Sequence, residues 1–262
     1  MDSLNKILLI ALGLSLISLI TIRIFNTFSL NKIIIHEINT ADSNISSSKI
    51  DSIISKFMVY LRAEEINVLY GETESYYRIN QMLNKRKKQI VIPKWIMPSV
   101  GYELDYILAS IWFNVKLYQK DKDIKRIQLI VKWIPLFLYI IYYSTLITAI
   151  VFSFLNKASI IKENPSKFLI FLFEKPIFEF ISITAFLFIV TLMFFSNSLK
   201  NGLEEKYEME IIQFVKNECD SYNKDISIAR IYSKEFNKLD FKVFRFNSKT
   251  SNLKFVGPFT LL

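Results

Sequence analysis

The sequence contains few of the residues on which catalytic and metal sites are usually built. Five glycines, one cysteine and one histidine occur among 262 residues. One cysteine cannot form a disulfide framework, and so few sulfur and imidazole groups exclude a Cys-rich or His-rich metal cage. The glycines form neither a phosphate-binding loop nor a G-x-S-x-G nucleophile elbow. We therefore expect a non-enzymatic protein with no cofactor and no bound metal.

The remaining candidates for catalysis stand in unfavourable sequence contexts. His36 precedes a glutamate but has no second nitrogen or sulfur ligand at a metal-binding spacing. Cys219 lies between Glu218 and Asp220, whose charges raise the pKa of a thiol. Neighbouring carboxylates on a helix point about 100° apart and are typical of a solvated face. The carboxylates of this kind are Glu64, Glu65, Glu72, Glu74, Glu204 and Glu205.

Apolar residues are abundant and are separated from the charged residues along the chain. Hydrophobic residues make up 52% of the sequence and charged residues 22%, and the mean hydropathy is +0.29. The formal net charge is +9, from 33 Lys and Arg against 24 Asp and Glu. This combination is typical of a membrane protein with polar regions outside the bilayer.

Three apolar runs are long enough to cross a bilayer. They cover residues 7–24, 133–155 and 177–196. The shortest would extend about 27 Å as a helix. A signal peptide is the alternative for the first run, but no small-residue cleavage site follows it, so we expect an uncleaved helix. No charge lies at the middle of any run, which disfavours a proton-coupled carrier.

The runs divide the chain into six parts. We predict transmembrane helices within residues 1–25, 133–155 and 177–196, a cytoplasmic and mostly helical domain at 26–132, a short outer loop with an interfacial segment at 156–176, and a cytoplasmic helix with β strands at 197–262. The expected fold class is a mainly α membrane protein with three transmembrane helices, a helical cytoplasmic domain and a small C-terminal α+β tail.

Periodicity indicates the elements of the two polar regions. Apolar residues recur at helical spacing over residues 46–71 and again over 104–118. Residues 203–215 also carry a helical apolar stripe. After residue 225, the alternation of Leu239, Phe241 and Val243 predicts two or three strands. So small a sheet rarely stands alone, and we expect the tail to pack on the first polar region or on another subunit.

Small and hydroxyl-bearing residues in the apolar runs are candidates for contacts between helices. Small residues let helices approach closely in lipid, and buried hydroxyls can bond across an interface. For the serine and threonine of the second run, the alternative is a bond to the carbonyl of their own helix one turn back. The candidates are Ala11, Ser15 and Ser18 in the first run and Ser144, Thr145 and Thr148 in the second.

A basic segment precedes the second run. Lys and Arg beside a membrane helix gain about 1 kcal/mol each from anionic lipid, and a solvated linker is the alternative. The residues expected to bind headgroups are Lys120, Lys122, Lys125, Arg126 and Lys132. Residues 85–88, Lys-Arg-Lys-Lys, could instead contact nucleic acid, but without an aromatic platform this is weak evidence, and we do not expect a nucleic-acid partner.

The flanking charges predict the orientation. Lys and Arg are retained on the cytoplasmic side, and more of them flank the run ends that lead into the two polar regions. We expect the N-terminus outside and the C-terminus in the cytoplasm. Abundant Ile, Lys, Asn and Phe with little Gly indicates an AT-rich coding sequence and hence a bacterial inner membrane.

The function that this organisation favours is that of a membrane-anchored effector or regulatory subunit of a multi-protein system, similar in role to a defence or toxin protein. We expect membrane lipids, a cytosolic protein and further copies of the chain as partners. The cytoplasmic domains would bind the cytosolic partner, and the helices would change their association or the permeability of the membrane. An oligomeric channel or transport component is the alternative. A membrane-bound enzyme without a local motif is the third interpretation.

Overall fold

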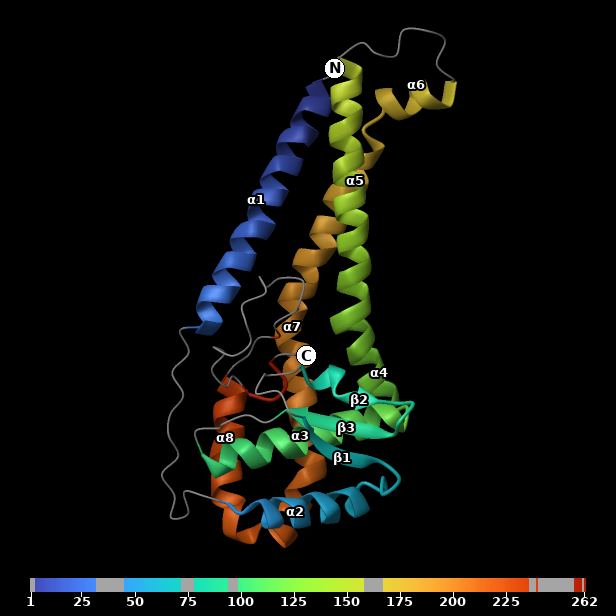
Figure 1. Cartoon of the computed structure of the whole chain (residues 1–262). Helices are drawn as coiled ribbons and strands as arrows, with labels where there is room; N and C mark the ends of the chain where they lie inside the picture. Colours follow the sequence, from blue (N-terminus) through green and yellow to red (C-terminus); the bar gives the residue numbers. More distant parts are fainter. Residues whose placement is uncertain are drawn as a thin grey trace.

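The computed structural model describes residues 3–31, 45–71, 78–93, 99–157, 167–235, 239, 257–260 and 262. Within this part the protein is mostly helical and contains one small sheet. Three long helices, α1 (Ser3–Asn31), α5 (Ile134–Lys157) and α7 (Ile177–Glu218), lie side by side. Figure 1 shows the other helices and the sheet gathered at one end of these three, except for α6 (Lys167–Glu174) at the opposite end.

The three long helices confirm the prediction of three apolar segments of membrane-spanning length. The stretches that are long and apolar enough to cross a bilayer are Leu4–Ser29, Lys122–Leu155 and Ile177–Glu218. Their large side chains point outward, as Phe137 and Phe194 do with 64% and 79% of their surface exposed. An outward apolar surface of this extent is expected of helices that face lipid.

α7 is one unbroken helix of 42 residues. The sequence predicts an apolar span at residues 177–196 and a separate charged helix after it. The two are continuous because the junction carries no proline and because apolar residues beyond it, such as Leu203, Tyr207 and Ile211, are buried in the polar domain.

The first polar region contains a sheet that periodicity did not indicate. β1 (Asn67–Gly71) pairs in parallel with β3 (Gln89–Pro93), and β2 (Leu83–Asn84) pairs antiparallel with the other side of β3. The short helix η1 (Ile79–Gln81) precedes β2. Strands of five and two residues are too short to show a clear alternation in the sequence.

The helix predicted up to residue 71 is wrong in its second half. α2 (Ser47–Tyr60) begins at the cap Ser46, as expected, but ends eleven residues earlier. Arg62 adopts a φ of 52°, and the amide of Ala63 donates to the carbonyl of Met58 at 2.9 Å. This left-handed residue and backbone bond are a Schellman-type end, which turns the chain into β1.

α3 (Val100–Tyr118) is the central helix of the polar domain. The predicted stripe is present, but residues off the stripe are buried as well, including Asp105 and Asn114 at 0% exposed. The helix is therefore enclosed on all sides instead of lying on a surface. Gly101 marks its closest approach to α8 (Asn223–Glu235), because a Cβ atom there would lie 2.3 Å from the carbonyl oxygen of Asp225.

A second continuous rod joins the polar domain to the long helices. α4 (Lys122–Gln128) is capped by the carboxylate of Asp121 and leads through the π-helical segment η2 (Leu129–Trp133) directly into α5. Figure 1 shows α4 at the lower end of α5, beside the sheet.

The C-terminal tail differs from its prediction. After α7 and the short helix η3 (Asp220–Tyr222), the chain forms a further helix, α8, which lies along α3. This contact agrees with the expected packing of the tail on the first polar region. Phe241 and Val243 lie outside the described residues, and residues 258–260 form a turn where a strand was predicted.

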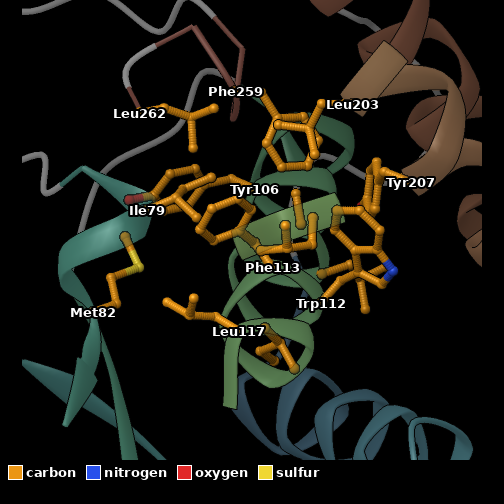
Figure 2. Packing of buried hydrophobic residues seen from close by; sticks show 14 of the residues in the cluster. Ile79, Met82, Tyr106, Trp112, Phe113, Leu117, Leu203, Tyr207, Phe259 and Leu262 are labelled. Carbon is orange, nitrogen blue, oxygen red and sulfur yellow. The ribbon is translucent and has the colours of Figure 1, made fainter. Parts of the chain in front are cut away.

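The C-terminal residues enter an aromatic core between α3 and α7. The ring of Phe259 lies 5.9 Å from that of Trp112 and 5.3 Å from that of Tyr207, both close to edge-on. Figure 2 shows Phe259 above α3 in this cluster, with Leu262 on the side of Ile79. Arg78 donates to the carbonyl of Leu262 at 2.7 Å, which fixes the chain end to the start of η1.

Candidate functional site

Ser15 lies at the interface between α1 and α5. Its side chain is 4% exposed, and its Oγ atom lies 2.9 Å from the hydroxyl of Tyr142 while donating to the carbonyl of Leu12. Ala11 and Ser18 are partly buried beside it, and the hydroxyl of Ser18 donates to its own helix at Leu14. Of the three small residues selected on α1, Ser15 is therefore the one with a polar bond to another helix.

The hydroxyl groups selected on α5 bond within their own helix. Each donates to a carbonyl three or four residues back, as in the alternative considered above. The residues are Ser144, Thr145 and Thr148.

Tyr142, and not the serine and threonines of α5, makes the polar contacts between helices. It is 0% exposed, it bonds Ser15 on α1, and its carbonyl accepts from Ser182 on α7 at 3.3 Å. One residue of α5 thus links all three long helices. The signal in the sequence was the excess of tyrosines in an apolar run, which did not single out this position.

A stripe of exposed residues changes character along α4, η2 and α5. Lys122, Lys125 and Arg126 come first, followed by Leu129, Lys132 and Trp133 and then by mainly apolar side chains, among them Phe137, Ile140 and Ile147. The ammonium of Lys132 lies 5.4 Å from the centre of the Trp133 ring. Basic residues followed by a tryptophan and an apolar face are the order expected where a helix enters a bilayer.

The acidic residues beside this stripe already have partners. Lys206 of α7 lies 3.1 Å from Asp121 and 2.8 Å from Asp123. In the described part of the chain, none of the five predicted headgroup residues forms an ion pair. Those five are Lys120, Lys122, Lys125, Arg126 and Lys132. Their positive charge is therefore available to an external anion.

Four buried charged side chains meet where α7 enters the polar domain. Arg230 of α8 places its Nη2 atom 2.5 Å from Oε2 of Glu204 and its Nη1 atom 3.5 Å from Oδ2 of Asp105. Lys200 lies 3.1 Å from Glu204 and donates to the carbonyl of Ser233 at 2.6 Å. The four are at most 5% exposed, so they form one buried network, with two positive and two negative groups.

Tyr207 of α7 contacts two members of this network, Asp105 and Arg230. Its hydroxyl donates to Oδ1 of Asp105 at 3.1 Å, and the guanidinium carbon of Arg230 lies 4.7 Å from the centre of its ring. The network thus joins one helix that continues into the apolar bundle, α7, to two that do not, α3 and α8. Because a buried charge without its partner costs several kcal/mol, the four groups hold these helices in one arrangement.

The surroundings change the acid–base behaviour of the network. Burial raises the pKa of Asp105 to about 6, against the opposing effect of Arg230. Burial lowers the pKa of Arg230, but the carboxylates of Asp105 and Glu204 raise it by more, so it stays above its ordinary value. Of Asp105 and Arg230, Asp105 is therefore the residue that changes charge, at about pH 6.

Several of the residues considered as catalytic can now be placed. Glu204 is 1% exposed and ion-paired, so its assignment to a solvated face is wrong, while Glu205 is exposed. Glu64 and Glu65 are exposed as expected, whereas His36, Glu72 and Glu74 lie outside the described residues. Burial, and then the charge of Glu218, raises the pKa of Cys219 to about 11. This thiol is poorly suited to nucleophilic attack.

The described residues contain no group of three or more His, Cys, Asp or Glu side chains placed to hold a metal ion. Comparison of the chain with family models, with curated proteins and with solved structures gives no match.

Proposed function

We propose that the protein is an integral protein of a bacterial inner membrane and acts without catalysis, as an effector or regulatory subunit of a multi-protein system. Its polar domain faces the cytoplasm and binds a protein partner. The movement produced by binding passes to the long helices and changes their association or the permeability of the membrane. The observation that carries this proposal is the continuity of α7 from the apolar bundle into the polar core.

The length of α7 fits this role. A helix of 42 residues extends about 63 Å, roughly twice the 30 Å hydrocarbon core of a bilayer. Its first half contacts α1 and α5, and its second half packs against α2 and α8. In this proposal, a tilt or rotation of the continuous helix carries a displacement of the polar domain into the bundle.

Specific contacts hold α7 in the polar domain and in the apolar bundle. At Lys200, just past the apolar half, the buried network fixes α3 and α8 to α7. Within the bundle, Tyr142 links α5 to both neighbours through Ser15 and Ser182. The α4–η2–α5 rod adds a second connection between domain and bundle, and its basic stripe binds lipid headgroups at the inner surface.

Insertions at the exposed junction between Asn197 and Ser198 test the coupling. Two alanines rotate the downstream half of α7 by about 200° and break the register between bundle and domain. Seven alanines rotate it by about 700°, which nearly restores the rotation and adds about 10 Å of helix, and they serve as the control for the rotational register. Each variant of the full chain is expressed at high level in a bacterium, with a potential-sensitive dye and growth as readouts.

We expect the wild type and the seven-residue variant to depolarise the membrane and slow growth, and the two-residue variant to do so much less. An unchanged potential with the wild type and both variants would contradict an effect on the membrane. Equal depolarisation by all three would contradict coupling through α7. Immunoblots of the membrane fraction must show equal amounts of each variant.

A further inference from the structure

We propose that the turn between β2 and β3 joins the basic residues of α4 in a single surface that binds anionic phospholipid headgroups. This inference rests on the membrane placement in the proposed function, and it adds a second arm to the basic stripe and a preference for anionic over zwitterionic lipid.

The turn presents three cations that the fold does not use. Lys85, Arg86 and Lys87 are exposed and form no ion pair with any described residue. The fourth basic residue, Lys88, adopts a φ of 48° and pairs with Glu65. Three adjacent like charges repel one another, and an external anion relieves that repulsion.

The last residue of the turn, Lys88, pairs with Glu65 near the end of α3, which leads into α4. Tyr118, the last residue of α3, is close enough to help lower the pKa of Glu65 and raise that of Lys88. Lys120 follows two positions later, and α4 begins at Lys122. Figure 1 shows the strands β2 and β3 reaching the side of the domain on which α4 lies.

Three acidic groups in this region are paired within the protein, whereas the exposed Glu64 forms no ion pair with a described residue. Glu65 is paired with Lys88, and Asp121 and Asp123 are paired with Lys206. The surface therefore carries eight cations that form no ion pair within the described chain. They are Lys85, Arg86, Lys87, Lys120, Lys122, Lys125, Arg126 and Lys132.

The geometry favours lipid over nucleic acid as the anion. The basic stripe of α4 leads into Trp133 and the outward apolar face of α5, so this surface adjoins the level at which the helix enters lipid. Single-stranded nucleic acid is usually held by aromatic rings that stack on its bases. The turn itself contains four basic residues and no aromatic one.

The test uses the full chain purified in neutral detergent and mixed with phosphatidylglycerol or phosphatidylcholine. After gel filtration, the lipid retained per protein is measured by phosphate analysis. The test variant is Lys85→Glu/Arg86→Glu/Lys87→Glu. The control, Lys49→Glu/Lys216→Glu/Lys224→Glu, makes the same change of charge at exposed positions around the far end of α7. In neutral detergent both should melt within about 2 °C of the wild type, because exposed substitutions are nearly neutral for stability.

We expect the wild type and the control variant to retain several-fold more phosphatidylglycerol than phosphatidylcholine, and the turn variant to lose at least half of this excess. About 0.5 M NaCl should remove the excess from all three. Equal retention of the two lipids, or a turn variant with wild-type retention, would overturn the inference. So would a labelled 20-nucleotide DNA that binds the wild type but not the turn variant while lipid retention stays unchanged.

Alkaline carbonate extraction separates this inference from the proposed function. A chain released from membranes by carbonate would refute the membrane placement, and with it both proposals. A chain that stays in the membrane but shows no preference for phosphatidylglycerol would refute the headgroup surface alone.

Discussion

The Nη2 atom of Arg230 lies 2.5 Å from Oε2 of Glu204, with both side chains almost completely buried. One residue belongs to the C-terminal helix α8 and the other to the long helix α7. Their pairing is an electrostatic contact between α8 and α7, and the free energy lost when it is broken can be measured.

Replacement of Arg230 by methionine should strongly destabilise the polar domain. It leaves Glu204 and Asp105 without their main counter-charge, which costs about 3–5 kcal/mol and lowers the melting temperature by roughly 10 °C. The matched control is Lys234→Met, which removes a largely exposed pair with Glu208 and should cost less than about 1 kcal/mol. Equal melting temperatures of the two variants in detergent would contradict the importance of the buried network.

The Asp105 carboxyl predicts a pH dependence of stability. Its pKa of about 6 lies above the ordinary value of 3.8, so the folded state holds this proton more tightly than the unfolded state. Its contribution to stability is therefore greatest below about pH 4, falls as the pH rises to about 6, and is constant above that.

Comparison with Asp105→Asn isolates this effect. The stability of the wild type relative to the variant should decrease between pH 4 and pH 7 by an amount on the order of 2 kcal/mol. Melting curves of both proteins across this range measure the difference, and other titrating groups cancel. A constant difference would show that folding does not raise the pKa of Asp105.

Replacement of Tyr142 by phenylalanine should weaken the contact of α1 with the bundle. The change removes the hydroxyl that bonds Ser15 and keeps the ring, so the expected cost is about 0.6 kcal/mol and at most near 1.7 kcal/mol. Tyr143→Phe is the control, since that ring is partly exposed.

Ser15→Ala gives a second check of the same bond. In the Tyr142→Phe background it should add little further loss, because the two groups share one interaction. Additive losses from the two substitutions would exclude the bond. Ser15→Ile is more disruptive, since its larger side chain enters the buried interface between α1 and α5, and should lower the melting temperature by more than Ser15→Ala does.

Reporter fusions should locate the polar domain. We expect fusions after Lys88 and after Asn247 to give fluorescent green fluorescent protein and inactive alkaline phosphatase. Both sites lie in polar regions that adjoin the Lys- and Arg-rich ends of the apolar runs, and these ends are expected in the cytoplasm. A fusion after the first residues of α6 is the internal control and should give the opposite pattern. Phosphatase activity at either of the first two sites would reverse the proposed orientation.

The long apolar helices were predictable because each is a long local pattern. A run of about twenty apolar residues needs no distant partner to be read as a helix, and the stripes of α2, α3 and the second half of α7 extend over several turns. β2, with two residues, offers no such pattern. α8 has few apolar positions, and it is stabilised as a helix by its contact with α3.

The buried network could not be predicted from the sequence. Asp105, Glu204 and Arg230 lie on three elements far apart in the chain, and a charged residue is ordinarily assigned to a solvated face. Ser15 could be selected together with Ala11 and Ser18 as a small residue in an apolar run, but its partner could not. Which of several tyrosines on α5 faces α1 depends on how the two helices cross.

The glycine at position 101 has a consequence for the charges about one turn further along α3 and α8. With only a hydrogen atom on its α-carbon, α3 lets the backbone of Asp225 come within a distance that no methyl group would allow. Even alanine there would force α8 outward and carry the guanidinium of Arg230 away from its two carboxylates. Gly101, which has no side chain, thus determines whether Arg230 can reach Asp105 and Glu204.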